Sequence, residues 1–147
     1  MVCVDDSDLS LHAAVAGFAL LQPARRVIVT TVAEHSDPLL VTGSGMAGGV
    51  MSAAEAEEID DSIRAEAGAV VQHAIDTLEV EGAEPVVLHG DPGRALCDLA
   101  AEVHADALVM GSRGRGGIKR ALLGSVSDHV VRNAPCTVII TGPSDSS

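Results

Sequence analysis

The sequence predicts a single α/β domain built on a five-stranded parallel sheet with helices on both faces. Apolar runs of strand length alternate with stretches whose apolar residues recur at helical spacing, and turn residues bound each run. The run at 26–32, RVIVTTV, is β-branched and nearly uninterrupted, which is typical of a strand covered on both faces. With 147 residues, 47% of them hydrophobic, the chain can build one ordinary core but not two. We therefore expect a doubly wound sheet with right-handed crossovers.

The first third of the chain is expected to form a strand, a helix and a second strand. The run VCV at 2–4 ends in the polar stretch DDSD, in which Ser7 or Asp8 can cap a helix. Pro23 separates that helix from the strand at 26–32. The apolar positions of the helix are Leu11, Val15, Phe18 and Leu21.

A glycine-rich loop and a long acidic helix are expected next. The glycine-rich tip TGSGMAGGV of the loop at 34–50 contains no basic residue, which favours a flexible linker over a phosphate-binding loop. Ser52 and Glu55 form a capping box at the start of the helix, and the acidic residues that follow are interpreted as a solvated face. The positions expected on its apolar face are Ile59, Ile63, Val70, Ala74 and Leu78.

The second half repeats the alternation. Strands are expected at 85–89, 106–112 and 136–140. Asp91 and Pro92 can start a helix that carries Leu96, Leu99 and Val103. A last helix is expected from about Ser125 to Asn133, because Pro135 blocks its continuation, and the domain is expected to span 1–142, with 143–147 as a flexible tail.

Composition excludes several classes of function. A net charge of -12 repels phosphate, and one Phe without Trp or Tyr offers no platform for stacking bases, so neither a nucleic acid nor an acidic membrane is an expected partner. The longest apolar runs are too short to span a bilayer, and no leader opens the chain, which predicts a cytoplasmic protein.

Metal and disulfide chemistry are not expected either. The three cysteines lie in apolar sequence without a C-x-x-C spacing, which indicates buried thiols in a reducing compartment. The six histidines show no ligand spacing, and no set of catalytic residues is identified.

The stretch GSRGRGGIKRALLGSV, residues 111–126, predicts a local anion site in this acidic chain. Gly111 and Gly114 follow a strand, and after nine more residues Gly124 and Ser125 open a helix. Glycines let backbone N–H groups approach an oxygen, and a helix start adds unpaired N–H groups and a positive dipole end. The residues expected to receive a phosphate are Gly124, Ser125 and Val126, with the hydroxyls of Ser125 and Ser127 as further donors and compensating charge from Arg113, Arg115, Lys119 and Arg120.

Two familiar phosphate-binding motifs are absent from the sequence. Lys119 does not stand in a G-x-x-x-x-G-K-[ST] motif, and the first strand leads into DDSD without a glycine, unlike the usual dinucleotide fingerprint. The alternative for Arg113 and Arg115 is a pair of solvated loop charges, and for Asp5 a helix-capping carboxylate.

The motif G-x-x-G-x9-G-S, preceded by DALVMGS and followed by VSDHVVRNAPCTVII, closely resembles the nucleotide-binding branch of the universal stress proteins. VCVDDSDLS is similar to the opening strand and V-D-G-S turn of that family. The resemblance implies a Rossmann-like fold of the adenine nucleotide alpha hydrolase type. It also implies ATP or AMP with Mg²⁺ at the carboxyl edge of the sheet, and a homodimer through the last strand.

Carried over by this resemblance, Asp5 would contact the adenine, Val32 would line the base pocket, and Met110 and Gly111 would flank the ribose and base. Gly114, Gly124, Ser125 and Val126 would hold the phosphates. The chain departs from the family pattern at Asp6, which replaces a glycine and would either repel the nucleotide or help to hold Mg²⁺. The chain also opens almost inside the first strand, as it would if a few residues had been lost from its start.

Three functions stay open at the level of sequence. The favoured one is a regulatory stress-response module in which ATP orders residues 111–124 and changes what the dimer recognises. The second is a stress-protein dimer that binds no nucleotide and acts through a partner surface. The third is a slow ATP hydrolase, although the family of related hydrolases would show S-G-G-x-D-S where this chain has VDDS.

Overall fold

Strands and helices alternate throughout the computed structural model of the chain, which describes residues 1–21, 23–33, 52–113 and 123–142. The expected loop at 34–50 and tail at 143–147 lie outside these residues. Within them the five predicted strands and four predicted helices are confirmed. The elements are β1 Val2–Cys3, α1 Asp8–Ala19, β2 Ile28–Ala33, α2 Ala53–Leu78, β3 Glu84–His89, α3 Pro92–Glu102, β4 Ala107–Gly111, α4 Ser125–Asn133 and β5 Thr137–Thr141.

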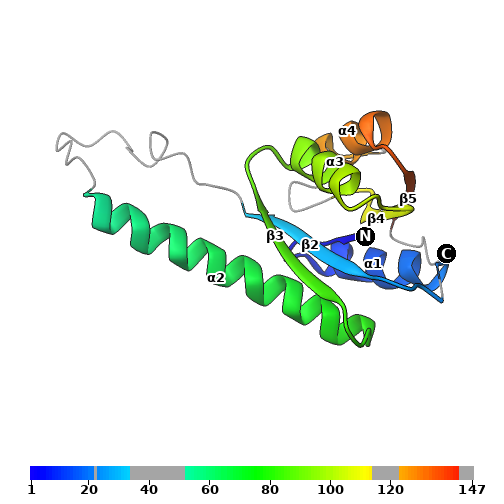
Figure 1. Cartoon of the computed structure of the whole chain (residues 1–147), viewed down its shortest axis with the longest axis horizontal. Coiled ribbons are helices and arrows are strands. Elements are labelled where there is room, and N and C mark those ends of the chain that lie inside the picture. The colour runs from blue at the N-terminus through cyan, green and yellow to red at the C-terminus, as the bar shows by residue number, and fades with distance from the viewer. Residues whose placement is uncertain (22, 34–51, 114–122, 143–147) are drawn as a thin grey trace.

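The five strands form one parallel sheet in the order β3-β2-β1-β4-β5. The chain starts at the centre, winds outward through β2 to the edge strand β3, and then returns to place β4 on the other side of β1 (Figure 1). The winding therefore reverses between β1 and β4, where Val2 pairs with Val109. In such sheets this switch point is where ligands bind, at the carboxyl ends of the strands.

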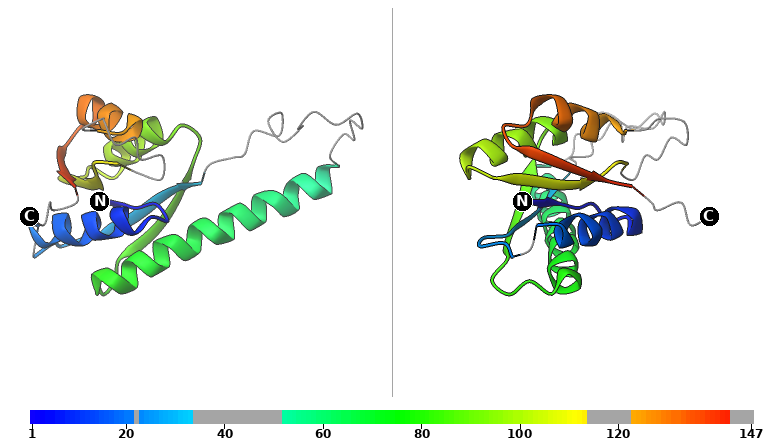
Figure 2. Two further views of the ribbon diagram at one scale, coloured as in Figure 1. Left: turned by 180° about the vertical axis from the view of Figure 1, so that it is seen from behind. Right: turned by 90° about the vertical axis from the view of Figure 1, so that its right-hand side faces the viewer.

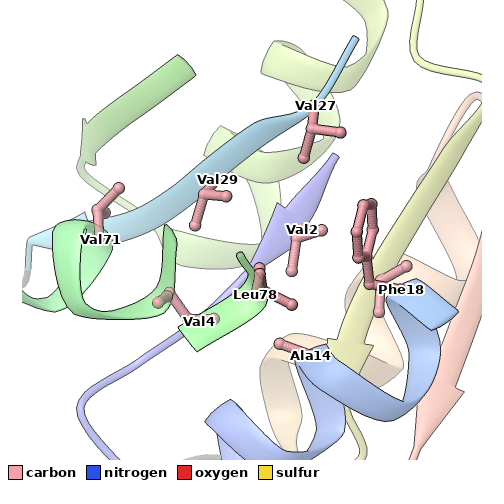
Figure 3. Close-up of a cluster of buried hydrophobic side chains, with 10 residues drawn as sticks. Val2, Val4, Ala14, Phe18, Val27, Val29, Val71 and Leu78 are labelled. Atoms are coloured by element: carbon pink, nitrogen blue, oxygen red, sulfur yellow. The ribbon is translucent and has the colours of Figure 1, made fainter. Parts of the chain in front are cut away.

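Helices cover both faces of the sheet, and each face has its own core. On one face α1 and α2 bury Val2, Val29, Phe18 and Val71, which Figure 3 shows pointing toward one another from four elements. On the other face, Leu96 of α3, Leu108 of β4 and Val130 of α4 are fully buried. No helix in the described part of the chain is long and apolar enough to cross a membrane.

Three of the four helices begin with a side-chain cap, as the sequence predicts. Ser7 accepts a hydrogen bond from the N–H of Ser10 at 3.2 Å, and Asp91 accepts one from the N–H of Arg94 at 2.9 Å. Ser52 and Glu55 form the expected capping box. Each cap satisfies a backbone donor that the first turn of a helix leaves unpaired.

Two predicted core positions are wrong. Val15 is 41% exposed, because α1 is apolar on all sides and its buried face is formed by Ser10, Ala13, Ala14, Gly17 and Phe18 instead. Ile59 is 47% exposed, because the first half of α2 extends beyond the sheet, as Figures 1 and 2 show. The first buried residue of α2 is Ala67.

Candidate functional site

The carboxyl ends of β1 and β4 lead into two short polar segments at the switch point. After β1, the Asp5 carboxylate oxygen Oδ1 accepts hydrogen bonds from the N–H of Ser7 at 2.9 Å and from its hydroxyl at 2.5 Å. The N–H of Asp5 donates to Oγ of Ser10 at 2.8 Å. Asp5 therefore shapes the turn that leads into α1, but the residue that caps this helix is Ser7. The predicted contact of Asp5 with adenine stays a prediction.

After β4, Ser112 connects three elements through its backbone. Its N–H donates to the carbonyl oxygen of Thr141 in β5 at 2.8 Å. Its carbonyl oxygen accepts the N–H of Gly124 and the hydroxyl of Ser127, each at 2.8 Å. These bonds hold the start of α4 against the end of β4. Sequence reasoning missed Ser112 because it acts through main-chain groups, which leave no signal in the choice of side chain.

The start of α4 differs from the other helix starts because no side chain caps it. Its N-cap is Gly124, with φ −76° and ψ 167°. A Cβ atom added to Gly124 would lie 3.7 Å from its nearest neighbours, Arg113, Ser112 and Ser127, which is ordinary contact. The surrounding described residues therefore do not require glycine at 124. Because glycine has no side chain, Gly124 leaves the N–H groups at the start of α4 uncovered, and the binding of an anion requires such groups.

Arg113 lies beside this helix start. A Cβ atom on Gly124 would be 3.7 Å from the Cα atom of Arg113. The Nε atom of Arg113 is buried and has no hydrogen-bond partner among the residues that the structure describes. A buried guanidinium donor without an acceptor is unfavourable, so this nitrogen is suited to an anion supplied from outside the protein.

The other residues predicted for the site either pack inside the protein or lie outside the described residues. Met110 is buried in the core under α3 and α4, and Val32 and Val126 pack against the same core. Gly111 is closely packed, since a Cβ atom there would lie 3.1 Å from the Arg113 carbonyl oxygen and 3.4 Å from Ala13 Cβ, so the carbonyl would have to shift by a few tenths of an ångström. Gly114, like Arg115, Lys119 and Arg120, lies outside the described residues.

The two serines at the start of α4 have different environments. Ser125 is exposed at the first helical position, where its N–H and hydroxyl can reach a ligand. Ser127 is buried, and its hydroxyl lies 2.8 Å from the Ser112 carbonyl oxygen and 3.0 Å from that of Gly124. The hydroxyl of Ser127 thus donates its proton to a carbonyl oxygen of the protein. Ser127 therefore holds the start of α4 in position. Its predicted contact with phosphate would require that bond to break.

The thiol of Cys3, the last residue of β1, is a further ionisable group at this edge of the sheet. Burial, with the nearby charge of Asp5 as a smaller contribution, raises the pKa of the Cys3 thiol on β1 to about 12. No group of three His, Cys, Asp or Glu side chains that could hold a metal ion occurs in the described ranges. Among the described residues at this edge, the start of α4 offers hydrogen-bond donors and Arg113 a positive charge, whereas Asp5 and Asp6 carry negative charge at the end of β1.

Comparisons with known proteins place these features in a family. Residues 1–142 match the sequence model of the Universal stress protein family. The universal stress protein YxiE of Bacillus subtilis is 28% identical over 143 residues, which cover 95% of each chain. The universal stress protein Slr1101 of Synechocystis is 34% identical over 83 residues, 50% of this chain and 77% of that protein. A crystal structure of a universal stress protein in complex with cAMP superposes with a TM-score of 0.62 at 29% identity, covering 95% of this chain and 94% of the other.

Proposed function

The chain belongs to the universal stress protein family, and from this premise we propose that it binds an adenine nucleotide, with the phosphates at the start of α4. One observation carries the proposal: α4 alone among the described helices begins at a residue without a side-chain cap, close to the Cα atom of Arg113, whose buried Nε has no hydrogen-bond partner among the described residues. A similar protein, 29% identical to this chain, forms a complex with cAMP, which supports the same class of ligand here.

The groups at the helix start fit a nucleotide phosphate. The N–H groups of Ser125 and Val126 and the hydroxyl of Ser125 donate to phosphate oxygens, and Arg113 supplies charge-assisted hydrogen bonds. The base lies toward the ends of β1 and β2, near Asp5 and Val32, with Gly111 and Met110 beneath the ribose. Gly114 is retained as a proposed phosphate contact on the strength of the family motif.

ATP is the proposed ligand, with AMP as the alternative, and Mg²⁺ accompanies the triphosphate. Because the described residues bring together no set of three potential metal-ligating side chains, the phosphate oxygens and water supply most of the ligands of the ion. Asp5 and Asp6 follow the end of β1 and are carboxylates at this edge of the sheet.

The proposed role is regulatory: nucleotide occupancy changes the surface around the start of α4, and a homodimer formed through the edge strand β5 presents that surface to a partner. Each of the two alternative functions can be distinguished from this regulatory role by one measurement. A stress-protein dimer without nucleotide would carry none when isolated. An ATP hydrolase would turn over ATP at about 1 per second or faster, as metabolic enzymes do.

The test combines extraction of nucleotide from the isolated protein with calorimetric titration of ATP and Mg²⁺ into Gly124→Val. The branched side chain would cover the N–H groups of the helix start, and we expect binding to be abolished while the fold is retained. Gly68→Val is the matched control, because a Cβ atom at Gly68 on α2 has no neighbour within 4 Å. Equal affinity in Gly124→Val and wild type would refute the role of the helix start.

A further inference from the structure

Thr141, the last residue of the edge strand β5, is bonded to a helix from the opposite end of the chain. Its hydroxyl donates to the carbonyl oxygen of Ala13 in α1 at 2.7 Å, across 128 positions of the sequence. A backbone carbonyl oxygen has two lone pairs, so a carbonyl inside a helix can accept such a bond in addition to its helical one. The end of β5 is thereby attached to the middle of α1.

The side chain of Thr141 fits against two small residues of α1. Ala13 and Gly17 lie one turn apart on the helix, and both are buried. A Cβ atom added to Gly17 would lie 3.4 Å from Cγ2 of Thr141, so the threonine methyl group packs on Gly17 while the hydroxyl bonds to Ala13. Valine would reproduce the packing of this side chain but not the hydrogen bond.

The backbone of Thr141 extends the link to the proposed phosphate site. Its carbonyl oxygen accepts the N–H of Ser112 at 2.8 Å. The carbonyl oxygen of Ser112 in turn accepts the N–H of Gly124 and the hydroxyl of Ser127. A continuous series of hydrogen bonds therefore leads from α1 through β5 and the end of β4 to the start of α4.

The position of Thr141 in the sheet explains why its hydroxyl matters. Thr141 pairs with Gly111 in the last step of the β4–β5 ladder, and within the described part of the chain no strand pairs with β5 on its other side. Strand ends at a sheet edge open more easily than the centre, because few bonds hold them. If the end of β5 opened, Ser112 would lose its hydrogen-bond acceptor, and the start of α4 would be held less firmly.

We infer that Thr141 is a positioning residue, whose hydroxyl bond to Ala13 holds Ser112 and, through Ser112, the N–H groups at the start of α4. Its effect on ligand binding rests on the proposed function, because Thr141 acts through Ser112 and makes no contact with the phosphates. Donors that keep one geometry bind an anion more tightly than donors that must first be ordered. Loosening the start of α4 therefore weakens binding although no contact with the ligand is removed.

The first experiment measures amide hydrogen exchange by NMR in the ligand-free protein. In Thr141→Val we expect the N–H groups of Ser112 and Gly124 to exchange about tenfold faster than in the wild type, because local opening becomes easier. The N–H of Ala105, which donates to a carbonyl oxygen of α3 at 2.9 Å, is the internal control and should exchange as before. Thr141→Ser keeps the hydroxyl, and its exchange should stay within about twofold of the wild type.

The second experiment is a calorimetric titration of ATP with Mg²⁺ into the same proteins. Thr141→Val should bind about tenfold more weakly than the wild type, and Thr141→Ser should retain the wild-type affinity. Thr77→Val on α2 is the matched control, because the hydroxyl of Thr77 donates to the carbonyl oxygen of His73 at 2.8 Å. It loses the same kind of bond on the opposite face of the sheet from α4, so its affinity should not change.

The outcomes separate this inference from the proposed function. Unchanged exchange of Ser112 and Gly124 in Thr141→Val would overturn the inference, and so would an equal acceleration at Ala105, which would indicate a loss of global stability alone. Wild-type affinity for ATP in Thr141→Val would also overturn it. A wild-type protein that binds no ATP would refute the proposed function instead, and the exchange rates of the ligand-free protein would still decide the role of Thr141.

Discussion

The hydroxyl of Ser127 donates to the carbonyl oxygen of Ser112 at 2.8 Å, across 15 positions of the sequence. This bond joins the end of the fourth strand to the first turn of the fourth helix, on either side of the proposed phosphate site. The geometry of that proposed site therefore depends on a buried serine whose hydroxyl forms its hydrogen bonds inside the protein.

Replacing Ser127 with alanine should destabilise the protein by about 1 kcal/mol, the usual cost of one lost hydrogen bond. The loss stays small because the Ser112 carbonyl keeps the N–H of Gly124 as a donor at 2.8 Å. Nucleotide affinity should fall with it, since the helix start loses one of its two links to β4. Urea denaturation and calorimetric titration measure the two effects. Ser125→Ala is the control for stability, because Ser125 is exposed and should change it little.

Replacing Gly17 with alanine should destabilise the fold by about 1–3 kcal/mol, the range for overpacking. The added Cβ atom would lie 2.4 Å from Cγ1 of Val109, so α1 would have to move away from β4. Gly68→Ala makes the same change on α2, where the Cβ atom meets nothing within 4 Å, and should stabilise by up to about 1 kcal/mol through helix propensity. Equal denaturation midpoints for the two variants would contradict the close packing of α1.

Replacing Arg113 with glutamine should weaken nucleotide binding about tenfold without lowering the stability of the ligand-free protein. Its Nε atom is buried and has no acceptor among the described residues, so removing it costs no hydrogen bond there, whereas the ligand loses a charged donor. Arg94→Gln, on an exposed side chain of α3, is the control for net charge. Titration calorimetry at two salt concentrations tests the prediction, which fails if both variants lose affinity equally.

The Cys3 thiol should resist alkylation in the folded protein. Burial, followed by the charge of Asp5, raises its pKa from an ordinary 9.0 to about 12, and only the thiolate reacts. Because the folded pKa is the higher one, the thiol contributes stability that is complete below pH 9 and is lost as pH rises toward 12. Peptide mass spectrometry after iodoacetamide treatment should find Cys3 modified far more slowly in native protein than in urea. Equal rates would show that the thiol is accessible.

The order of the elements could be predicted because each signal for it is local. Ser7, the Ser52 capping box and Asp91 mark three helix starts by their own side chains, and Pro135 marks the end of a fourth. The start of α4 could be predicted because glycine and serine stand there, and its role in binding phosphate stays a prediction.

What could not be predicted depends on contacts between distant segments. Val15 fits an apolar period in a helix that carries apolar residues on all sides, and only the packing of α1 on β4 decides which side is buried. Ile59 also falls on the apolar period of its helix, but the sheet does not extend far enough to cover it. Ser112 carries no side-chain signal, because it acts through its carbonyl oxygen. The hydrogen bond from the Ser127 hydroxyl to that carbonyl also joins distant segments, and the contact of Ser127 with phosphate stays a prediction.

The central position of β1 also determines when this protein can fold during its synthesis. Val2 pairs with Val29 on one side but with Val109 on the other, so the middle of the sheet is incomplete until most of the chain has left the ribosome. Until then the nascent segment from β1 to β3 exposes the unpaired edge of its first strand, which invites contact with other unfinished chains. Slow translation beyond α3 should prolong that exposure, and chaperone binding to nascent chains of this length should be strongest there.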